Sequence, residues 1–277
     1  ERPTGPTRAG LSGVAADERH EVLLVAFPID RVLRELPRAL RRARGELVAY
    51  RPEARAVLRS KSDYVHVRAQ PLGGAELVAG TLAERAGLRC AAIDGAAGDR
   101  VVRESGLEGA PFRGEAGAAR ALGEALARLH AQDDGGALPR AGVIDELDES
   151  LRACRELAFL DPVLGERAFE LVAALGSAPP GNLPAVVRHG ALTGERVRVQ
   201  GDAVALRGFC RATRGPAARD LATLSVDLIA RGIDPAPACD ELLAGYRRAI
   251  PASDLAWFVA NAALQASTAA FGRGRAD

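Results

Sequence analysis

The stretch VRHGALTGERVRV at residues 187–199 decides how the rest of the chain is interpreted. It begins within a short apolar run at 185–188, passes through a loop that contains Gly190 and Gly194, and ends in a second run at 197–200. A third run of strand composition follows at 203–207. Helical spacing precedes this block at 144–159 and 165–175, and it resumes at 217–231, 237–249 and 254–269. We therefore predict a small block of strands and loops within a helical region.

The first hundred residues have a different pattern. Short runs of strand character, separated by turn residues, predict an antiparallel meander at 46–50, 54–59 and 63–68. A helix at 76–86, ended by Gly87, and strands at 89–93 and 100–104 are predicted to follow. An earlier helix is predicted at 29–44, with Asp30 near its start and a kink at Pro37.

These patterns predict an α+β fold with two lobes. We assign 29–104 to a small mixed lobe with an antiparallel sheet, and 105–114 to a glycine-rich hinge. Residues 115–277 form a larger, mainly helical lobe that starts with a helix at 115–130. Residues 1–28 lack periodicity, and the first 18 lack the apolar centre of a signal peptide, so we expect a flexible leader.

Composition disfavours several classes of function. The 37 basic and 36 acidic residues nearly cancel and only 4% of residues are aromatic, which argues against nucleic-acid binding. No apolar run has the length of a membrane span. The cysteines are too widely spaced for a zinc site and are expected to be reduced and mostly buried, which favours a cytoplasmic location: Cys90, Cys154, Cys210 and Cys239.

Five ordered segments carry a resemblance to a known family. The stretch 187–199 resembles the catalytic loop of aminoglycoside phosphotransferases and related small-molecule kinases, H-G-D-x-x-x-x-N-x-x-V. LRGFC at 206–210 resembles their I-D-F-G metal-binding segment, and GPAARDLA at 215–222 resembles the G-D-P-x-x-D-L-A that follows. LARLH at 126–130 and YRPEARAVLR at 50–59 resemble a helix end and the first hairpin, Y-R-P-G-x-R. The resemblance spans about 29–270 and implies a protein-kinase-like fold of two lobes.

The positions that carry the chemistry of this family are changed. The resemblance places Ala191 at the catalytic aspartate, Arg196 at the asparagine that holds magnesium, and Gly208 at the second metal-binding aspartate. Ala191 cannot accept a proton, Arg196 repels a cation and Gly208 has no carboxylate. The resemblance therefore implies no catalytic residue, no metal site and weak or absent binding of Mg-ATP.

Two phosphate-facing positions of the small lobe are changed as well. His66 stands where the family has the lysine that pairs with nucleotide phosphates, and histidine is a weaker base with a shorter reach. Glu53 replaces the hairpin glycine and adds negative charge beside phosphate oxygens. These changes within one intact framework predict a pseudokinase, a kinase-like body that binds a partner or ligand without turnover.

Two alternatives stay open from the sequence. A divergent but active phosphotransferase would need a relocated carboxylate, and the candidates are Glu195, Asp202 and Asp220. In a metal-independent nucleotide sensor, Arg196 would contact phosphates directly. The histidines His130 and His189 are interpreted as packing residues, the latter bracing the loop, and Asp220 is also explained as a structural residue in a first helical turn.

Basic side chains supply the candidate binding surfaces, with a solvated surface as the alternative. A protein-kinase-like fold would gather a set of arginines, with His66 and His189, around the cleft, where they suit carboxylates or phosphates. These arginines are Arg51, Arg55, Arg188, Arg196, Arg198, Arg207, Arg211 and Arg214. A second set forms a stripe on the predicted first helix: Arg31, Arg34, Arg38, Arg41 and Arg42. We expect a protein or peptide partner, for which the family offers a precedent in subunits of peptide-modifying complexes.

Overall fold

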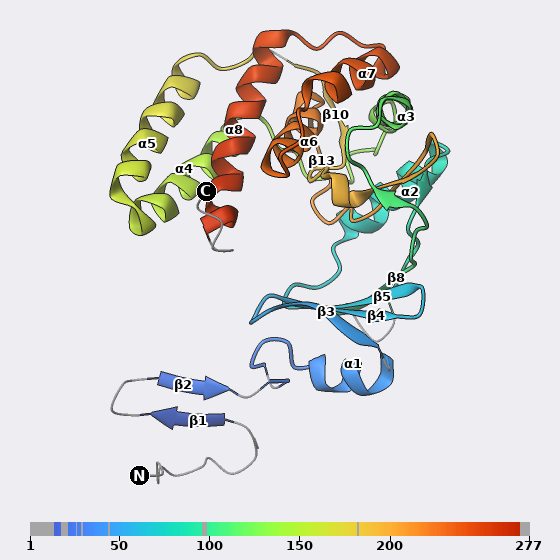
Figure 1. Ribbon diagram of the computed structural model, residues 1–277, viewed down its shortest axis with the longest axis vertical. Helices are drawn as coiled ribbons and strands as arrows, with labels where there is room; N and C mark the ends of the chain where they lie inside the picture. Colours follow the sequence, from blue (N-terminus) through green and yellow to red (C-terminus); the bar gives the residue numbers. More distant parts are fainter. Residues whose placement is uncertain are drawn as a thin grey trace. The chain divides into compact units, whose positions relative to one another are not determined.

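A computed structural model of the protein describes residues 14–17, 22–25, 27, 28, 30–43, 45–95, 99–181 and 183–271. The chain divides into two compact units (Figure 1). The sheet unit comprises Glu1–Leu72 and Ala92–Gly106, and the helical unit comprises Gly73–Ala91 and Leu107–Asp277. An antiparallel sheet in one unit and helices in the other confirm the predicted α+β fold class.

The sheet unit is built on the predicted antiparallel meander. The sheet has the order β3-β4-β5-β8-β7, with strands β3 (Glu46–Arg51), β4 (Arg55–Ser60), β5 (Asp63–Arg68), β7 (Ile93–Gly95) and β8 (Val101–Glu104). Alternate residues of β4 and β5, such as Leu58 and Val67, are buried against Leu36 and Ala39 of helix α1 (Leu36–Ala43). Full burial of a leucine such as Leu58 stabilises this unit by about 1.5–3 kcal/mol.

Helix α1 is shorter than the predicted helix at 29–44. It begins at Leu36 because the carboxylate of Asp30 accepts hydrogen bonds from the N–H groups of Val32 and Leu33, both at 2.8 Å, and holds this segment in turns. Pro37 lies in the first turn of α1, where its missing N–H has no partner to lose, so the predicted kink is wrong.

Two short strands lie within the segment 1–28, for which the sequence predicted no regular structure. Strands β1 (Val14–Asp17) and β2 (Val22–Val25) pair in antiparallel register. Runs of four residues are too short to show a period, which is why pattern analysis missed them. Apart from positions 27 and 28, the rest of this segment lies outside the described residues, as do residues 29 and 44 at the ends of the predicted first helix.

The helical unit contains the predicted helices with small shifts at their ends. They are α3 (Ala116–His130), α4 (Val143–Leu160), α5 (Pro162–Ser177), α6 (Ala218–Ala230), α7 (Ala236–Tyr246) and α8 (Ala252–Phe271). One small sheet has the order β6-β12-β11-β9, with β6 (Arg89–Cys90), β9 (Ala110–Pro111), β11 (Val197–Gln200) and β12 (Ala203–Leu206). A second sheet pairs β10 (Ala185–Arg188) with β13 (Thr213–Pro216). Strand β13 was not predicted because its sequence, TRGP, has no apolar alternation and contains both Gly and Pro.

One predicted part of the small lobe belongs to the helical unit instead. Helix α2 (Gly74–Arg85), followed by Gly87 with a φ of +70°, packs Ala79 and Leu82 into the same core as Phe112. Strand β6 (Arg89–Cys90) pairs in parallel with β12 of the helical unit. The predicted strand at 89–93 is therefore divided, because only β7 joins the large sheet.

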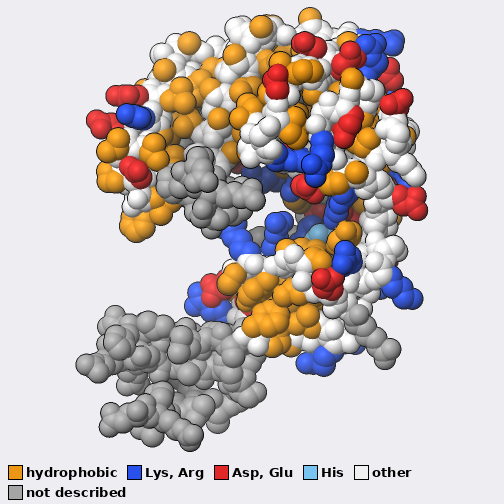
Figure 2. Space-filling model, viewed as in Figure 1, with side chains coloured by type: hydrophobic (Ala, Val, Ile, Leu, Met, Phe, Trp, Pro, Cys, Tyr) orange, Lys and Arg blue, Asp and Glu red, His pale blue; other side chains and the backbone are white. Residues whose placement is uncertain are grey.

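Buried apolar side chains hold the helical unit together, while one end of it is unusually apolar outside. Phe112, Leu126 and Phe209 belong to the larger core, and Trp257 and Phe258 to a second core between α4, α5, α6 and α8. At the turn between α4 and α5, the side chains of Phe159, Leu160 and Val163 are exposed, as Figure 2 shows on the left edge of the view. Among the described helices, none is long and apolar enough for a membrane crossing.

Candidate functional site

The loop after β10 is held from behind by one buried carboxylate. Asp220, in the first turn of α6, accepts hydrogen bonds from the backbone N–H groups of His189 at 2.8 Å and Gly190 at 2.9 Å. His130, at the end of α3, contacts the same carboxylate at 3.3 Å and the hydroxyl of Tyr246 at 2.9 Å. Asp220 thus connects two helices to the loop, as its structural interpretation predicted.

The ionisation of this cluster follows from its burial. Burial alone would raise the pKa of Asp220, but the hydrogen bond and charge of His130, with the charges of His189 and Arg188, lower it to about 2. Burial lowers the pKa of His189 to about 4. Since the Nε2 atom of His189 lies 2.9 Å from the carbonyl oxygen of Arg207, that nitrogen carries the proton of a neutral ring. The ring also packs on Phe209, with centroids 4.7 Å apart, so His189 braces the loop.

Gly190 fixes how closely the loop approaches the following segment. Its φ is +77°, and a Cβ atom at this position would lie 1.8 Å from the carbonyl oxygen of Arg211. Only glycine fits such a conformation and such a contact. The loop at 189–191 and the segment at 210–213 are therefore bound into one rigid surface.

Arg196 and Gly208 occupy the two positions at which the resemblance would place metal ligands. Arg196 follows Glu195 in the 3-10 turn η1 (Gly194–Arg196), and its Nη1 atom donates to the carbonyl oxygen of Gly208 at 2.8 Å. Its Nη2 atom lies 3.8 Å from the sulfur of Cys210. A Cβ atom on Gly208 would lie 3.5 Å from Cδ and Nε of Arg196, so the arginine side chain occupies the space beside Gly208. Sequence reasoning placed these two residues together but did not foresee the hydrogen bond.

Magnesium does not fit this arrangement. Its protein ligands are oxygen atoms, mainly carboxylates, whereas Ala191 and Gly208 have no side-chain oxygen, the carbonyl oxygen of Gly208 accepts from Arg196, and Arg196 is a permanent cation. Among the described residues, no group of His, Cys, Asp and Glu side chains is arranged to hold a metal ion.

The three carboxylates that could have replaced the missing catalytic groups are Glu195, Asp202 and Asp220. Asp220 is fully buried and accepts the hydrogen bonds of the loop. Glu195 is exposed, and Asp202 lies in the turn between β11 and β12, where its carboxylate packs against the Cα atom of Gly117. The geometry thus gives Asp220 a bracing role and brings none of these carboxylates to Arg196.

The changed residues of the sheet unit have local partners. The Nε2 atom of His66 on β5 lies 3.0 Å from the carboxylate of Glu104 on the neighbouring β8, and both side chains are largely buried. Glu53 adopts a φ of 56° in the turn between β3 and β4, and its carboxylate pairs with Arg31. A shared cleft of His66 with Ala191, Arg196 and Gly208 stays a prediction, because His66 belongs to the other unit.

The expectation that Arg188 contributes to a cationic surface was wrong. Arg188 is buried, where its Nη1 atom contacts Glu146 of α4 at 3.0 Å and its Nε and Nη2 atoms donate to Thr213. Arg219 of α6 contacts the other oxygen of Glu146, also at 3.0 Å. We call Arg188, Glu146 and Arg219 the buried triad.

Other predicted residues have mixed outcomes. Arg214 pairs with the buried carboxylate of Asp134. The hydrogen bonds from the N–H of Leu138 and from Arg214 lower the pKa of that carboxyl and outweigh the opposing effect of burial. Arg211 is exposed, as a binding candidate should be. Cys210 is exposed as well, contrary to the expectation of mostly buried thiols, whereas Cys154 is buried and Cys90 and Cys239 are half-buried.

Sequence reasoning missed the buried triad entirely. Glu146 and Arg219 have the charge of surface residues, and no pattern in the sequence pairs positions so far apart. The one available signal was the apolar context of Arg188, which follows Val186 and Val187 in a strand where an arginine is out of place unless it has a buried partner.

The sequence matches the phosphotransferase enzyme family (APH) over residues 29–266. The chain belongs to this family. The match includes the loop at 189–196, the segment around Gly208 and the bracing Asp220, so both the kept and the changed positions lie inside it. Among curated proteins, none matches the sequence.

Solved structures of phosphotransferases share the fold. An aminoglycoside phosphotransferase, APH(3'')-Id from Streptomyces rimosus, is 21% identical, with a TM-score of 0.61 over 83% of this chain and 96% of that one. A choline/ethanolamine kinase family protein from Mesorhizobium loti is 20% identical, with a TM-score of 0.58 over 84% and 81% of the two chains. The macrolide 2'-phosphotransferase MphH from Brachybacterium faecium is 18% identical, with a TM-score of 0.56 over 83% and 86%. At these identities the likeness establishes the kinase-like fold alone.

Proposed function

We propose that this protein is a catalytically inactive member of the phosphotransferase family that works by binding a partner or ligand. The observation that carries the proposal is the contact between Arg196 and the carbonyl oxygen of Gly208 at 2.8 Å. A side chain anchored in this way is part of the loop's structure. Its guanidinium cannot leave without the loss of a charge-assisted hydrogen bond.

Electrostatics supports the same proposal. A guanidinium stays protonated at all physiological pH values, so Arg196 keeps a positive charge beside Gly208. A divalent cation about 4 Å from it would be repelled by about 8 kcal/mol at an effective dielectric constant of about 20. No carboxylate stands at 191 or 208 to offset that repulsion. Mg-ATP binding is expected to be weak or absent.

The sheet unit supports the proposal from the nucleotide side. His66 already faces Glu104 at 3.0 Å, so its imidazole has a local partner in place of a phosphate. The carboxylate of Glu53 stands at the hairpin turn and pairs with Arg31, so it places negative charge where phosphate oxygens would approach. Both features weaken nucleotide binding independently of the metal.

The proposed binding role includes a protein or peptide partner with acidic groups. Arg38, Arg41 and Arg42 are exposed on α1, and Arg34 is exposed in the turn before it. The opposite face of α1 is buried, so these side chains can only face outward. An acidic partner would relieve the repulsion among them. A subunit of a cytoplasmic, bacterial peptide-modifying complex is one assembly of this kind.

The competing function is a divergent but active phosphotransferase. The observation in its favour is that Asp220 holds the backbone of the loop in place through His189 and Gly190. The two functions differ in turnover. We expect purified protein with Mg²⁺ and ATP to form no ADP above a protein-free control, alone or with aminoglycosides, macrolides, choline and sugars as acceptors. ADP formation that depends on both Mg²⁺ and one acceptor would establish the competing function.

A further inference from the structure

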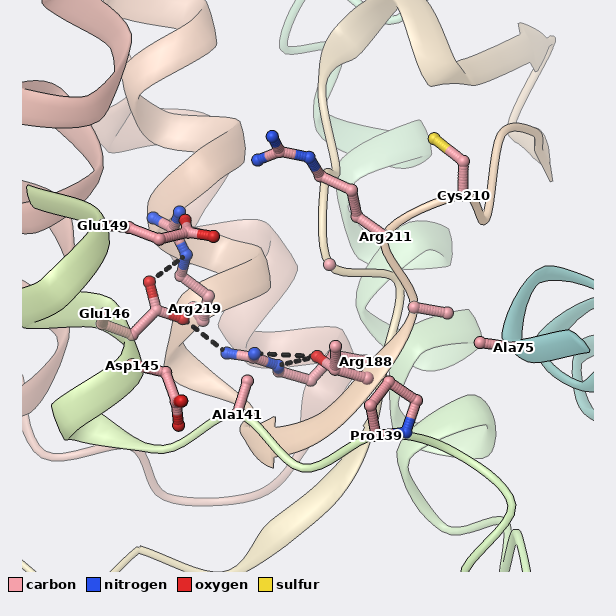
Figure 3. Close-up of a pocket in the computed structure, with 13 residues that line it drawn as sticks. Ala75, Pro139, Ala141, Asp145, Glu146, Glu149, Arg188, Cys210, Arg211 and Arg219 are labelled. Atoms are coloured by element: carbon pink, nitrogen blue, oxygen red, sulfur yellow. Dashed lines mark hydrogen bonds and ion pairs between the residues drawn. The ribbon is translucent and has the colours of Figure 1, made fainter. Parts of the chain in front are cut away.

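A pocket of about 290 Å³ lies beside the buried triad (Figure 3). It is formed entirely by the helical unit, between α4, α6 and the segment at 210–213. Its size is near the lower end of the range for small-molecule sites, about 300–1,000 Å³. Charged side chains gather at the end formed by α4 and α6, and the opposite end is lined by Ala75 and Pro139. The pocket thus has one polar end and one apolar end.

The buried triad leaves one donor unused at the polar end. Both oxygens of Glu146 are engaged by the two arginines, and the donors of Arg188 are taken by Glu146 and Thr213. Arg219 uses Nε for Glu146 and Nη2 for Gln265, while its Nη1 atom is buried without a hydrogen-bond acceptor. The charges of Glu149 and Asp220 also act on Arg219, so positive and negative groups lie together at this end of the pocket. The unpaired Nη1 atom calls for a hydrogen-bond acceptor.

Two further side chains present open groups of opposite sign to the same space. Arg211 is exposed and extends toward the side of the pocket formed by Glu149 and Arg219, as Figure 3 shows. Glu149 is half-buried on α4, where its charge acts on Arg219. Both Glu149 and Arg211 line the pocket. Asp145 adds a second carboxylate, although one of its oxygens already accepts the N–H of Gly142 at 2.7 Å.

We propose that this pocket binds a small zwitterion with the chemistry of an α-amino acid that has an apolar side chain. The carboxylate would accept hydrogen bonds from Arg211 and lie beside the guanidinium of Arg219, and the ammonium group would face Glu149 and Asp145. The apolar side chain would lie toward Ala75 and Pro139. A simple anion would leave the acidic side chains without a partner, and a simple cation would leave the arginines without one.

This inference rests on the proposed binding function and gives it a ligand class. It is tested without nucleotide and in EDTA, whereas the proposed function is tested by ADP formation with Mg²⁺. The two tests can therefore fail independently. ADP formation would contradict the proposed function alone, and a lack of zwitterion binding would contradict this inference alone.

Three related probes separate the two charges of the ligand. L-Leucine carries both charges, L-leucinamide has lost the carboxylate, and N-acetyl-L-leucine has lost the ammonium group. We expect titration calorimetry to show binding of L-leucine that is at least tenfold tighter than binding of either blocked form. Because the three probes share one side chain, the difference reports the two charged ends.

Two substitutions assign those ends to residues. Arg211→Gln should weaken L-leucine binding about tenfold and remove the preference over L-leucinamide, while Glu149→Gln should remove the preference over N-acetyl-L-leucine. Arg167→Gln and Glu170→Gln, both exposed on α5, are the matched controls and should leave all three affinities unchanged.

Three results would overturn the proposal. One is the absence of L-leucine binding at millimolar concentrations, which would mean that Arg211 and Glu149 close the pocket by pairing with each other. The second is equal binding of L-leucine and one blocked form, which would mean a simple anion or cation site. The third is binding that neither Arg211→Gln nor Glu149→Gln changes, which would place the ligand elsewhere.

Discussion

The two sides of the loop at 189–196 differ in what they have kept. On the inner side, Asp220 still binds the backbone of His189 and Gly190, and His130 still supports Asp220. On the outer side, Ala191 and Gly208 have no side-chain oxygen for a metal, and Arg196 has a permanent positive charge. The inner contacts set the path of the backbone and the outer side chains set the chemistry, so one can be lost while the other stays.

Removal of the Asp220 carboxylate, which holds the loop from α6, should destabilise the protein more than any other change proposed here. Asp220→Ala leaves two backbone N–H groups and His130 without their buried acceptor, and should lower the free energy of unfolding by about 3–5 kcal/mol. Urea unfolding followed by the fluorescence of Trp257, the one tryptophan of the chain, measures it within the helical unit. Asp220→Asn keeps one acceptor and should lose less.

Exposed Glu195 in the same loop is the matched control. Glu195→Ala should change the free energy of unfolding by less than about 0.5 kcal/mol, because its side chain faces solvent. A loss below about 1 kcal/mol for Asp220→Ala would mean that the inner contacts do not hold the loop.

Acid should destabilise the helical unit in a window set by His189. The unfolded chain takes up a proton on this histidine at its ordinary pKa of 6.5, but the folded protein does so only near pH 4. Between these values the unfolded state binds more protons, so stability falls as pH falls, by about 3 kcal/mol in total. The stabilising contribution of Asp220 is lost at lower pH, between its ordinary pKa of 3.8 and about 2.

Urea unfolding at pH 7, 5.5 and 4.5 checks this window, and His189→Gln should reduce the slope between pH 6.5 and 4. A slope that is the same with and without His189 would assign the acid sensitivity to other groups.

Restoring the outer side should recover metal binding without turnover. The triple variant Ala191→Asp, Arg196→Asn, Gly208→Asp supplies the missing ligands and removes the guanidinium. It should bind Mg²⁺ by calorimetry and still form no ADP, because His66 and Glu53 are unchanged. We expect a stability cost of about 1 kcal/mol, since Gly208 has a φ of +77°.

The double variant that keeps Arg196 provides the comparison. Ala191→Asp with Gly208→Asp should bind no Mg²⁺, because the guanidinium stays beside residue 208. If the double variant binds Mg²⁺ as tightly as the triple variant, Arg196 is not what excludes the metal.

Charge reversal on α1 should have the smallest effect on the protein itself. Arg34→Glu, Arg38→Glu and Arg41→Glu change exposed side chains, so the Tm should shift by no more than about 2 °C. The variant with all three arginines reversed should release a native partner in pull-downs. Reversal of exposed Arg152, Arg155 and Arg167 on α4 and α5 is the control and should retain it. Retention of every partner by the α1 variant would exclude this surface as the docking site.

The elements predicted correctly from the sequence are those whose residue spacing matches the element that the structure forms. The meander of β3, β4 and β5 follows from strand alternation between turn residues, and the long helices follow from apolar spacing. Helix α1 was predicted too long because the carboxylate of Asp30 accepts hydrogen bonds from the N–H groups of Val32 and Leu33. These bonds hold the segment in turns although its apolar residues have helical spacing. Strand β13 has no apolar alternation in its own sequence, and it is a strand because it pairs with β10.

The candidate site was predictable only where a motif fixed the positions. The motif located Ala191, Arg196 and Gly208, and chemistry then indicated that they cannot bind a metal. It gave no means of knowing that Arg188 is buried against Glu146, since ion pairs between distant helices and strands leave no spacing in the sequence. The pocket next to that pair was invisible for the same reason.

Titration of ATP into the protein, with and without Mg²⁺, tests the central claim most directly, because it requires no knowledge of an acceptor substrate. The account predicts that calorimetry finds weak or absent binding and that Mg²⁺ does not strengthen it, since Arg196 is anchored to Gly208 and neither position 191 nor position 208 has a carboxylate. Binding of ATP that becomes at least tenfold tighter on addition of Mg²⁺ would contradict the account.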